Sequence, residues 1–129
     1  MHHPAPLLLG SFFSVAASTT TPGRLQAQLH LNAHHAVFSG HFPGQPVVPG
    51  VCVLAIVKDV LAQHLGKQLL LRHCGHVKFV HPVNPLAMPE LDLTVDYSIR
   101  PYFLDFQVSL QHHEQALCRV AGSFQTDFL

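Results

Sequence analysis

Hydrophobic and polar positions alternate along most of this 129-residue chain. In residues 24–31, every second side chain from Leu25 to Leu31 is apolar, and the side chains between them are mostly polar. A period of two is typical of a half-buried β-strand. An apolar, β-tolerant stretch predicts an earlier strand over residues 7–18, followed by a turn over 18–23. Strand-like runs predict further strands over residues 69–80, 91–99, 103–110 and 116–124.

Residues 51–65 break this alternation. Their apolar side chains recur at helical spacing, and most of the remaining circumference is apolar too, which is typical of a buried helix. Gly66 follows as a suitable helix stop. Two strands, one helix and about four further strands predict an α+β fold, in which an antiparallel β-sheet wraps around one long buried helix.

The composition indicates that much apolar surface is covered. Hydrophobic residues make up 48% of the chain and charged residues 11%, whereas an average soluble protein has about 25% charged residues. We expect the apolar excess to lie in an oligomer interface or in an apolar ligand tunnel, with at least a homodimer or a higher homo-oligomer. The length predicts a single domain over residues 1–129.

Charge, cysteine content and hydropathy exclude several classes of protein. Seven basic and seven acidic residues cancel, so no basic field favours nucleic acid. Cys52, Cys74 and Cys118 form no disulfide framework, and we expect reduced thiols. No basic N-terminal region precedes the first apolar stretch, and no apolar run reaches the ~18 residues of a membrane span. A cytoplasmic protein without a membrane span is the expectation.

Two further groups of residues invite a chemical interpretation. One group contains four possible metal ligands, His73, Cys74, His76 and His81, but their spacing is not the usual spacing of metal ligands. Alternation along a strand would also place His73 and His81 on one face and Cys74 and His76 on the other. We therefore expect no metal. Cys52, just inside the helix, is interpreted as a small buried hydrophobe rather than as a nucleophile.

The stretch from Gly40 to Val51 carries the chemistry. It holds one histidine, three prolines and three glycines, which specify a rigid path that neither a helix nor a strand follows. We expect it to hold His41 in position and Gly50 to open the helix, whose first turn presents free N–H groups. A neutral imidazole beside such a donor is suited to removing a proton next to a carbonyl. The alternative is a rigid loop around a buried histidine without a chemical role.

The sequence His41-Phe42-Pro43-Gly44-x-Pro46-x-x-Pro49-Gly50-Val51 resembles the signature loop of the beta-hydroxyacyl-acyl-carrier-protein dehydratases. These are hot-dog-fold enzymes of fatty acid synthesis. Residues 77–85 are similar to the family's strand and its proline-rich turn. The resemblance implies a long helix surrounded by an antiparallel sheet, with two subunits that pair into a continuous sheet and build active sites at their interface.

The resemblance also implies a hydro-lyase that removes water from a 3-hydroxyacyl thioester. His41 would be the catalytic base or acid, and the Gly50 N–H would bind the thioester carbonyl. An acyl carrier protein would deliver the acyl chain on its phosphopantetheine arm into an apolar tunnel between subunits, with no other cofactor. The implied substrate-binding residues are Phe42, Pro43, Pro46, Val47, Pro49, Val51 and Ala55.

Position 55 departs from the family pattern. The family's second catalytic group is a glutamate or aspartate five residues after the glycine, and Ala55 cannot protonate a leaving hydroxyl. Asp59 is the candidate acid because it follows at i+4 on roughly the same helix face, about 6 Å further along the axis. Its other interpretation is a solvated or Lys/Arg-paired residue near the helix end.

Three other sources of the acid stay open. They are His34, His35 and a group from the partner subunit, although both histidines also fit surface positions at a strand end. The missing acid leaves two alternatives to a dehydratase. One is a non-catalytic subunit that binds acyl thioesters, and the other is a thioesterase.

Overall fold

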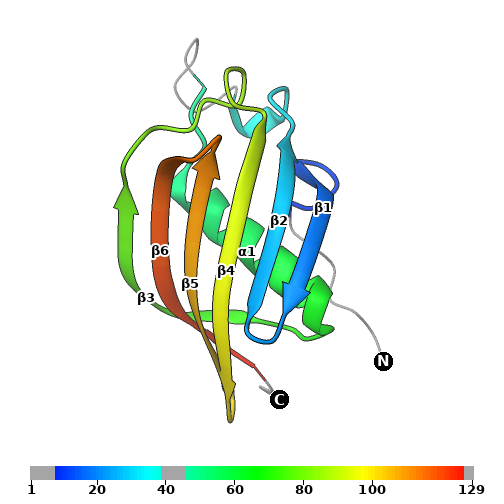
Figure 1. Cartoon of the computed structure of the whole chain (residues 1–129), viewed down its shortest axis with the longest axis vertical. Coiled ribbons are helices and arrows are strands. Elements are labelled where there is room, and N and C mark those ends of the chain that lie inside the picture. The colour runs from blue at the N-terminus through cyan, green and yellow to red at the C-terminus, as the bar shows by residue number, and fades with distance from the viewer. Residues whose placement is uncertain (1–7, 39–45, 127–129) are drawn as a thin grey trace.

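The computed structural model describes residues 8–38 and 46–126, which form six strands, one α-helix and one short 3-10 helix (Figure 1). In chain order these are β1 (Phe13–Thr21), β2 (Arg24–Leu31), η1 (Ala36–Phe38), α1 (Gly50–Leu65), β3 (Leu70–Phe79), β4 (Glu90–Arg100), β5 (Phe103–His112) and β6 (Gln115–Gln125).

The six strands form one antiparallel sheet in the order β1-β2-β4-β5-β6-β3. The sheet curves around α1, which lies against one of its faces (Figure 1). The core lies between the two layers, where Val57 of α1, Val95 of β4 and Leu104 of β5 are fully buried. The predicted α+β architecture, a hot-dog fold with one helix inside an antiparallel sheet, is confirmed.

The first strand begins later than the sequence pattern predicts. Residues 8–12 form a turn, in which Gly10 has a φ of +94°, and β1 starts at Phe13. The predicted turn over 18–23 is also too long, because Thr19–Thr21 continue β1 and pair with Arg24–Gln26. Threonine is β-branched and suits a strand. The chain reverses at Pro22-Gly23, where Gly23 has a φ of +76°.

The predicted helix is confirmed, with Gly66 in the left-handed conformation at its C-terminus. Its burial is more one-sided than its apolar circumference predicts. Val53, Ile56 and Val57 are buried against the sheet, whereas Val51 is 72% exposed and Leu54 is half-buried. One apolar strip of α1 therefore faces away from its own sheet.

Strand β3 lies at the edge of the sheet and leaves apolar side chains exposed (Figure 1). Val77 is 51% exposed and Phe79 is 45% exposed, although both oppose buried residues of β6 and therefore point to the helix side. Two register shifts interrupt the β3–β6 pairing, between Leu71 and His73 and between Cys74 and His76. No helix in the described part of the chain is long and apolar enough to cross a membrane.

Candidate functional site

The N-terminus of α1 presents free backbone donors. Pro49 precedes the helix and has an extended backbone, with a φ of −65° and a ψ of 148°. It forms no side-chain capping hydrogen bond, and the first turn of the helix contains no acidic residue. The Pro49 carbonyl accepts hydrogen bonds from the N–H groups of Cys52 and Val53. Within the described residues, no acceptor bonds to the Gly50 N–H. A helix start of this kind, with the positive end of the helix dipole, suits an oxygen that carries negative charge.

Gly50 also has a packing role that the sequence did not reveal. A Cβ added at Gly50 would lie 3.2 Å from Cε2 and 3.3 Å from Cζ of Phe79 in β3. The aromatic ring therefore occupies the space that a side chain would need. The end of β3 and the beginning of α1 meet at this point.

The last residues of the Gly40–Val51 stretch are fixed by the segment after β3. The Val48 N–H donates to the Val83 carbonyl over 2.9 Å, and both side chains are almost fully buried. The Leu117 carbonyl of β6 accepts from the N–H groups of Val80 and His81. The proline-rich turn thus connects the loop to the sheet, which gives the similarity over residues 77–85 a physical basis.

The predicted catalytic and substrate-binding residues fall into two groups. His41, Phe42 and Pro43 lie outside the described residues. The others precede or begin α1, where all but the exposed Val51 are half-buried; they are Pro46, Val47, Pro49, Gly50, Val51 and Ala55. Ala55 belongs to the same helix strip as Val51 and Leu54, so an apolar surface lies where the resemblance implies an acid.

Asp59 is buried rather than solvated, so the interpretation as a solvated residue near the helix end is wrong. It is 3% exposed, and its Oδ2 accepts hydrogen bonds from the backbone N–H groups of Leu8, over 2.6 Å, and Leu9, over 3.1 Å. Leu8 and Leu9, in the turn before β1, contact this part of the helix, which the sequence spacing could not reveal. The carboxylate therefore ties the N-terminal segment to α1.

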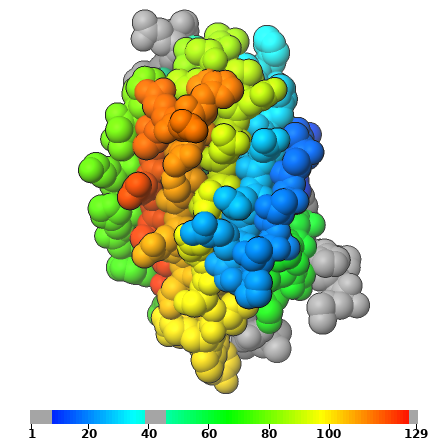
Figure 2. Space-filling model, in the orientation of Figure 1, coloured from blue at the N-terminus to red at the C-terminus, as the bar shows by residue number. Residues whose placement is uncertain are grey.

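The other carboxylates of the described residues lie away from the helix. On β4, Glu90, Asp92 and Asp96 alternate with buried apolar residues and therefore project from the outer face of the sheet. Figure 2 shows the molecule from this side, with β2, β4 and β5 next to one another. Asp105 takes the same face of β5 and pairs with Arg100. Glu114 lies in the turn between β5 and β6. Among the described residues, Asp59 alone carries a carboxylate on the helix side.

The two histidines before the loop differ in their surroundings. His34 is exposed, as the surface interpretation predicts. The half-buried His35 ring lies edge-on to Phe12, with centroids 5.3 Å apart, and its Nδ1 accepts a hydrogen bond from the Val37 N–H. His35 thus organises the short turn that ends at Phe38.

Burial describes the surroundings of Cys52, and strand register describes the arrangement of the histidines on β3. Cys52 is 6% exposed and its pKa is raised by burial, so it is a buried thiol rather than a nucleophile, as predicted. The register shifts in β3 place His73 and His76 on the same face, contrary to simple alternation. No group of three candidate metal ligands occurs among the described residues.

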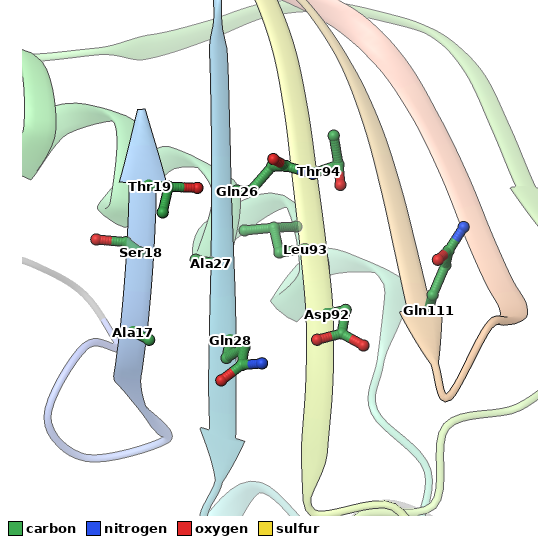
Figure 3. Close-up of a pocket in the computed structure, with 10 residues that line it drawn as sticks. All are labelled: Ala17, Ser18, Thr19, Gln26, Ala27, Gln28, Asp92, Leu93, Thr94 and Gln111. Carbon is green, nitrogen blue, oxygen red and sulfur yellow. The ribbon is translucent and has the colours of Figure 1, made fainter. Parts of the chain in front are cut away.

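A shallow depression on the outer face of the sheet has a different character from the helix start. Its lining includes Gln26, Gln28, Asp92 and Thr94, whose polar groups surround the hollow (Figure 3). An acyl chain requires a mostly apolar pocket. The apolar strip of α1 is the better match for such a ligand.

Comparison with known proteins identifies the family and the fold of the chain. The ApeI-like family, described as ApeI dehydratase, matches residues 17–120. The chain belongs to the ApeI-like dehydratase family. It is also 34% identical over 105 residues to the 3-hydroxyacyl-[acyl-carrier-protein] dehydratase FabZ of Novosphingobium aromaticivorans, which covers 74% of this chain and 63% of the relative. The chain thus spans less than two thirds of the length of that relative. It is 33% identical to the FabZ of Protochlamydia amoebophila, and that match covers 49% of this chain and 45% of the relative.

Solved structures of the same fold come from dehydratases and thioesterases. The dehydratase heterocomplex ApeI:P from Xenorhabdus doucetiae superposes with a TM-score of 0.69 and 23% identity, over 86% of this chain and 96% of that one. A hypothetical thioesterase from Streptococcus pneumoniae, solved with coenzyme A, gives a TM-score of 0.62 and 8% identity, over 88% and 84% of the chains. These two similarities concern the fold alone.

Proposed function

We propose that this chain is a subunit of a 3-hydroxyacyl-thioester dehydratase whose substrate is attached to an acyl carrier protein. The observation that carries the proposal is the uncapped Gly50 amide at the start of α1, within a segment that matches a dehydratase family. A thioester carbonyl that binds there gains a hydrogen bond and the field of the helix dipole. The pantetheine arm belongs to the substrate, so no separate cofactor is required.

In the proposed reaction, His41 removes the proton from C2 of the 3-hydroxyacyl thioester. The electron pair of that bond moves toward the thioester carbonyl, whose oxygen accepts the hydrogen bond from the Gly50 N–H. The C3 hydroxyl then leaves with one proton as water, and a double bond forms between C2 and C3. A general acid must supply that proton.

A second subunit is part of the proposal. Val51, Val77 and Phe79 expose apolar surface around the helix start, as expected of a surface covered by another chain. An identical subunit brings a second Ala55 and therefore no acid at that position. The ApeI:P structure of the same fold is a dehydratase heterocomplex, which supports a non-identical subunit as the partner. Identical and non-identical partners are distinguished by assaying the chain alone and after co-expression with a candidate subunit.

The test is turnover of a 3-hydroxyacyl carrier protein or its pantetheine analogue, followed by absorbance of the enoyl product. We expect His41→Ala to reduce the rate by roughly 10²–10⁴, the usual contribution of a general base. An equal rate in the wild type and in His41→Ala would refute the assignment.

A non-catalytic acyl-thioester-binding subunit is the second candidate, and Ala55 is the observation that favours it. It predicts binding of the acyl pantetheine, measured by calorimetry, without enoyl product under any pairing. Release of free thiol in the same samples tests the thioesterase alternative.

A further inference from the structure

The residues Leu8–Phe13, called the clasp below, connect α1 to the turn over residues 32–38, which precedes His41 in the sequence. Two consecutive backbone amides of the clasp, those of Leu8 and Leu9, donate to one oxygen of the buried Asp59 carboxylate. Hydrogen bonds from N–H groups to a carboxylate are stronger than those between neutral groups. The first contact of the clasp is thus a charge-assisted attachment to the middle of α1.

The clasp is a compact turn rather than an extended arm. The Leu8 carbonyl accepts hydrogen bonds from the N–H groups of Ser11 and Phe12, over 3.1 and 2.8 Å, and the Gly10 N–H donates to the Phe13 carbonyl. These bonds fix the positions of Leu8 and Phe12 relative to each other. A displacement at Asp59 therefore reaches Phe12.

Phe12 is the second contact of the clasp. Its ring is fully buried and stacks on the ring of Phe38, with centroids 5.3 Å apart and planes 29° apart. Asn32 adds two bonds, because its N–H donates to the Phe12 carbonyl and its side-chain Nδ2 donates to the Ser11 carbonyl. The clasp thus holds both ends of the turn over residues 32–38.

Phe38 ends that turn and precedes His41 by three residues. Its N–H donates to the His35 carbonyl over 3.1 Å, and the His35 N–H donates to the Asn32 carbonyl over 3.2 Å. The two groups of the proposed reaction therefore depend on different elements. Gly50 belongs to α1, whereas His41 follows the turn.

We propose that Asp59 is a positioning residue, which acts through the clasp to hold the turn before His41 at a fixed place relative to α1. This inference rests on the proposed function for its catalytic consequence. Misplacement of a catalytic group by about 1 Å can reduce a rate roughly 10²-fold. Asp59 thereby contributes to the reaction without touching the substrate.

The test combines hydrogen exchange with kinetics on the full-length chain. In Asp59→Leu, which removes the acceptor, we expect the Phe38 amide to exchange at least about tenfold faster, since local opening exposes that N–H. We expect kcat to fall roughly 10–100-fold with KM changed less than about threefold. Asp59→Asn keeps an oxygen acceptor and should retain most of the protection and most of kcat.

The control is Leu104→Ala, a fully buried site in β5 where the register pairs it with Ile99 and Phe124, outside the clasp and the helix start. It should lower the melting temperature while leaving kcat and Phe38 exchange unchanged below the transition. Asp59→Leu with wild-type Phe38 exchange would overturn the inference. If Asp59→Leu does not fold, Phe12→Leu decides, because it removes the ring stacking and should also accelerate exchange at Phe38.

Absence of turnover in every sample, including the wild type co-expressed with a candidate subunit, would refute the proposed dehydratase function. The exchange measurement would still decide whether Asp59 holds the turn. The two failures are therefore distinguishable.

Discussion

Gly50→Ala separates the chemical role of the Gly50 amide from its packing role. The added Cβ would lie 3.2 Å from the nearest atom of the Phe79 ring, so the ring must move by roughly 0.3 Å to reach an ordinary carbon–carbon contact of about 3.5 Å. Phe79 is 45% exposed and has room to move. Alanine also favours a helix over glycine by up to about 1 kcal/mol. The free energy of unfolding should therefore change by less than about 1 kcal/mol.

Activity should respond much more strongly than stability. The new methyl group stands beside the amide that receives the thioester oxygen, and loss of one such donor costs roughly 10²–10³ in rate. Because the methyl group obstructs the amide without removing it, we expect kcat/KM to fall roughly 10–100-fold. The measurement is kcat/KM with the 3-hydroxyacyl pantetheine, beside the melting temperature, which should shift by no more than roughly 5 °C.

The matched variant combines Gly50→Ala with Phe79→Leu, and Phe79→Leu alone is its reference. Leucine relieves the contact with the new Cβ but leaves the methyl group beside the amide. We expect the double variant to stay as slow as Gly50→Ala. Full recovery of kcat/KM in the double variant would mean that Gly50 serves packing, and the reasoning about its amide would be wrong.

Three further predictions concern the sheet and its edge. A Cβ added at Gly122 would overlap with the His73 carbonyl oxygen, so Gly122→Ala should separate β6 from β3. Urea titrations should then show a free energy of unfolding lower by about 1–3 kcal/mol. A variant as stable as the wild type would contradict this prediction. Burial raises the pKa of Cys118 to about 11, so the folded state keeps a proton that the unfolded thiol loses near its ordinary pKa of 9.0. Stability should therefore fall as the pH rises from 9 to 11, by about 2–3 kcal/mol, and Cys118→Ala should remove that part of the decline. Val77→Glu on the edge strand β3 should weaken self-association, measured by sedimentation, whereas Val15→Glu on the other edge strand, β1, should not. Equal effects of the two substitutions on self-association would exclude β3 as the interface.

The helix and most strands could be predicted because each depends on a local pattern. Helical spacing and Gly66 define α1, and alternation defines β2. Residues 8–12 were misassigned because apolar composition does not distinguish a strand from a partly buried turn. Their turn depends on the Asp59 carboxylate, a contact across 50 residues of sequence for Leu9.

The candidate site could be predicted only in part for the same reason. The Gly50 amide follows from the position of the helix start, which the sequence encodes locally. The contact of Phe79 with Gly50 and the bond from Val48 to Val83 join segments about 30 residues apart, and no local pattern reports them. Helical spacing placed Asp59 on the face of Ala55, but spacing cannot show which other segment covers that face.

Ala55→Glu tests whether the missing acid is the one defect of the proposed site. A glutamate at this position would stand on the half-buried strip of α1 beside Val51 and Leu54, and apolar surroundings favour the neutral form of a carboxyl group. A neutral carboxylic acid can protonate the leaving hydroxyl, so we expect the dehydration rate to rise roughly 10²–10⁴-fold. The gain should decline at alkaline pH, where the carboxyl group loses its proton. Leu54→Glu is the control, because it places the same group about 100° around the helix and should give no gain. If Ala55→Glu folds and binds the acyl pantetheine but forms no enoyl product, then the helix strip binds acyl chains without catalysing their dehydration.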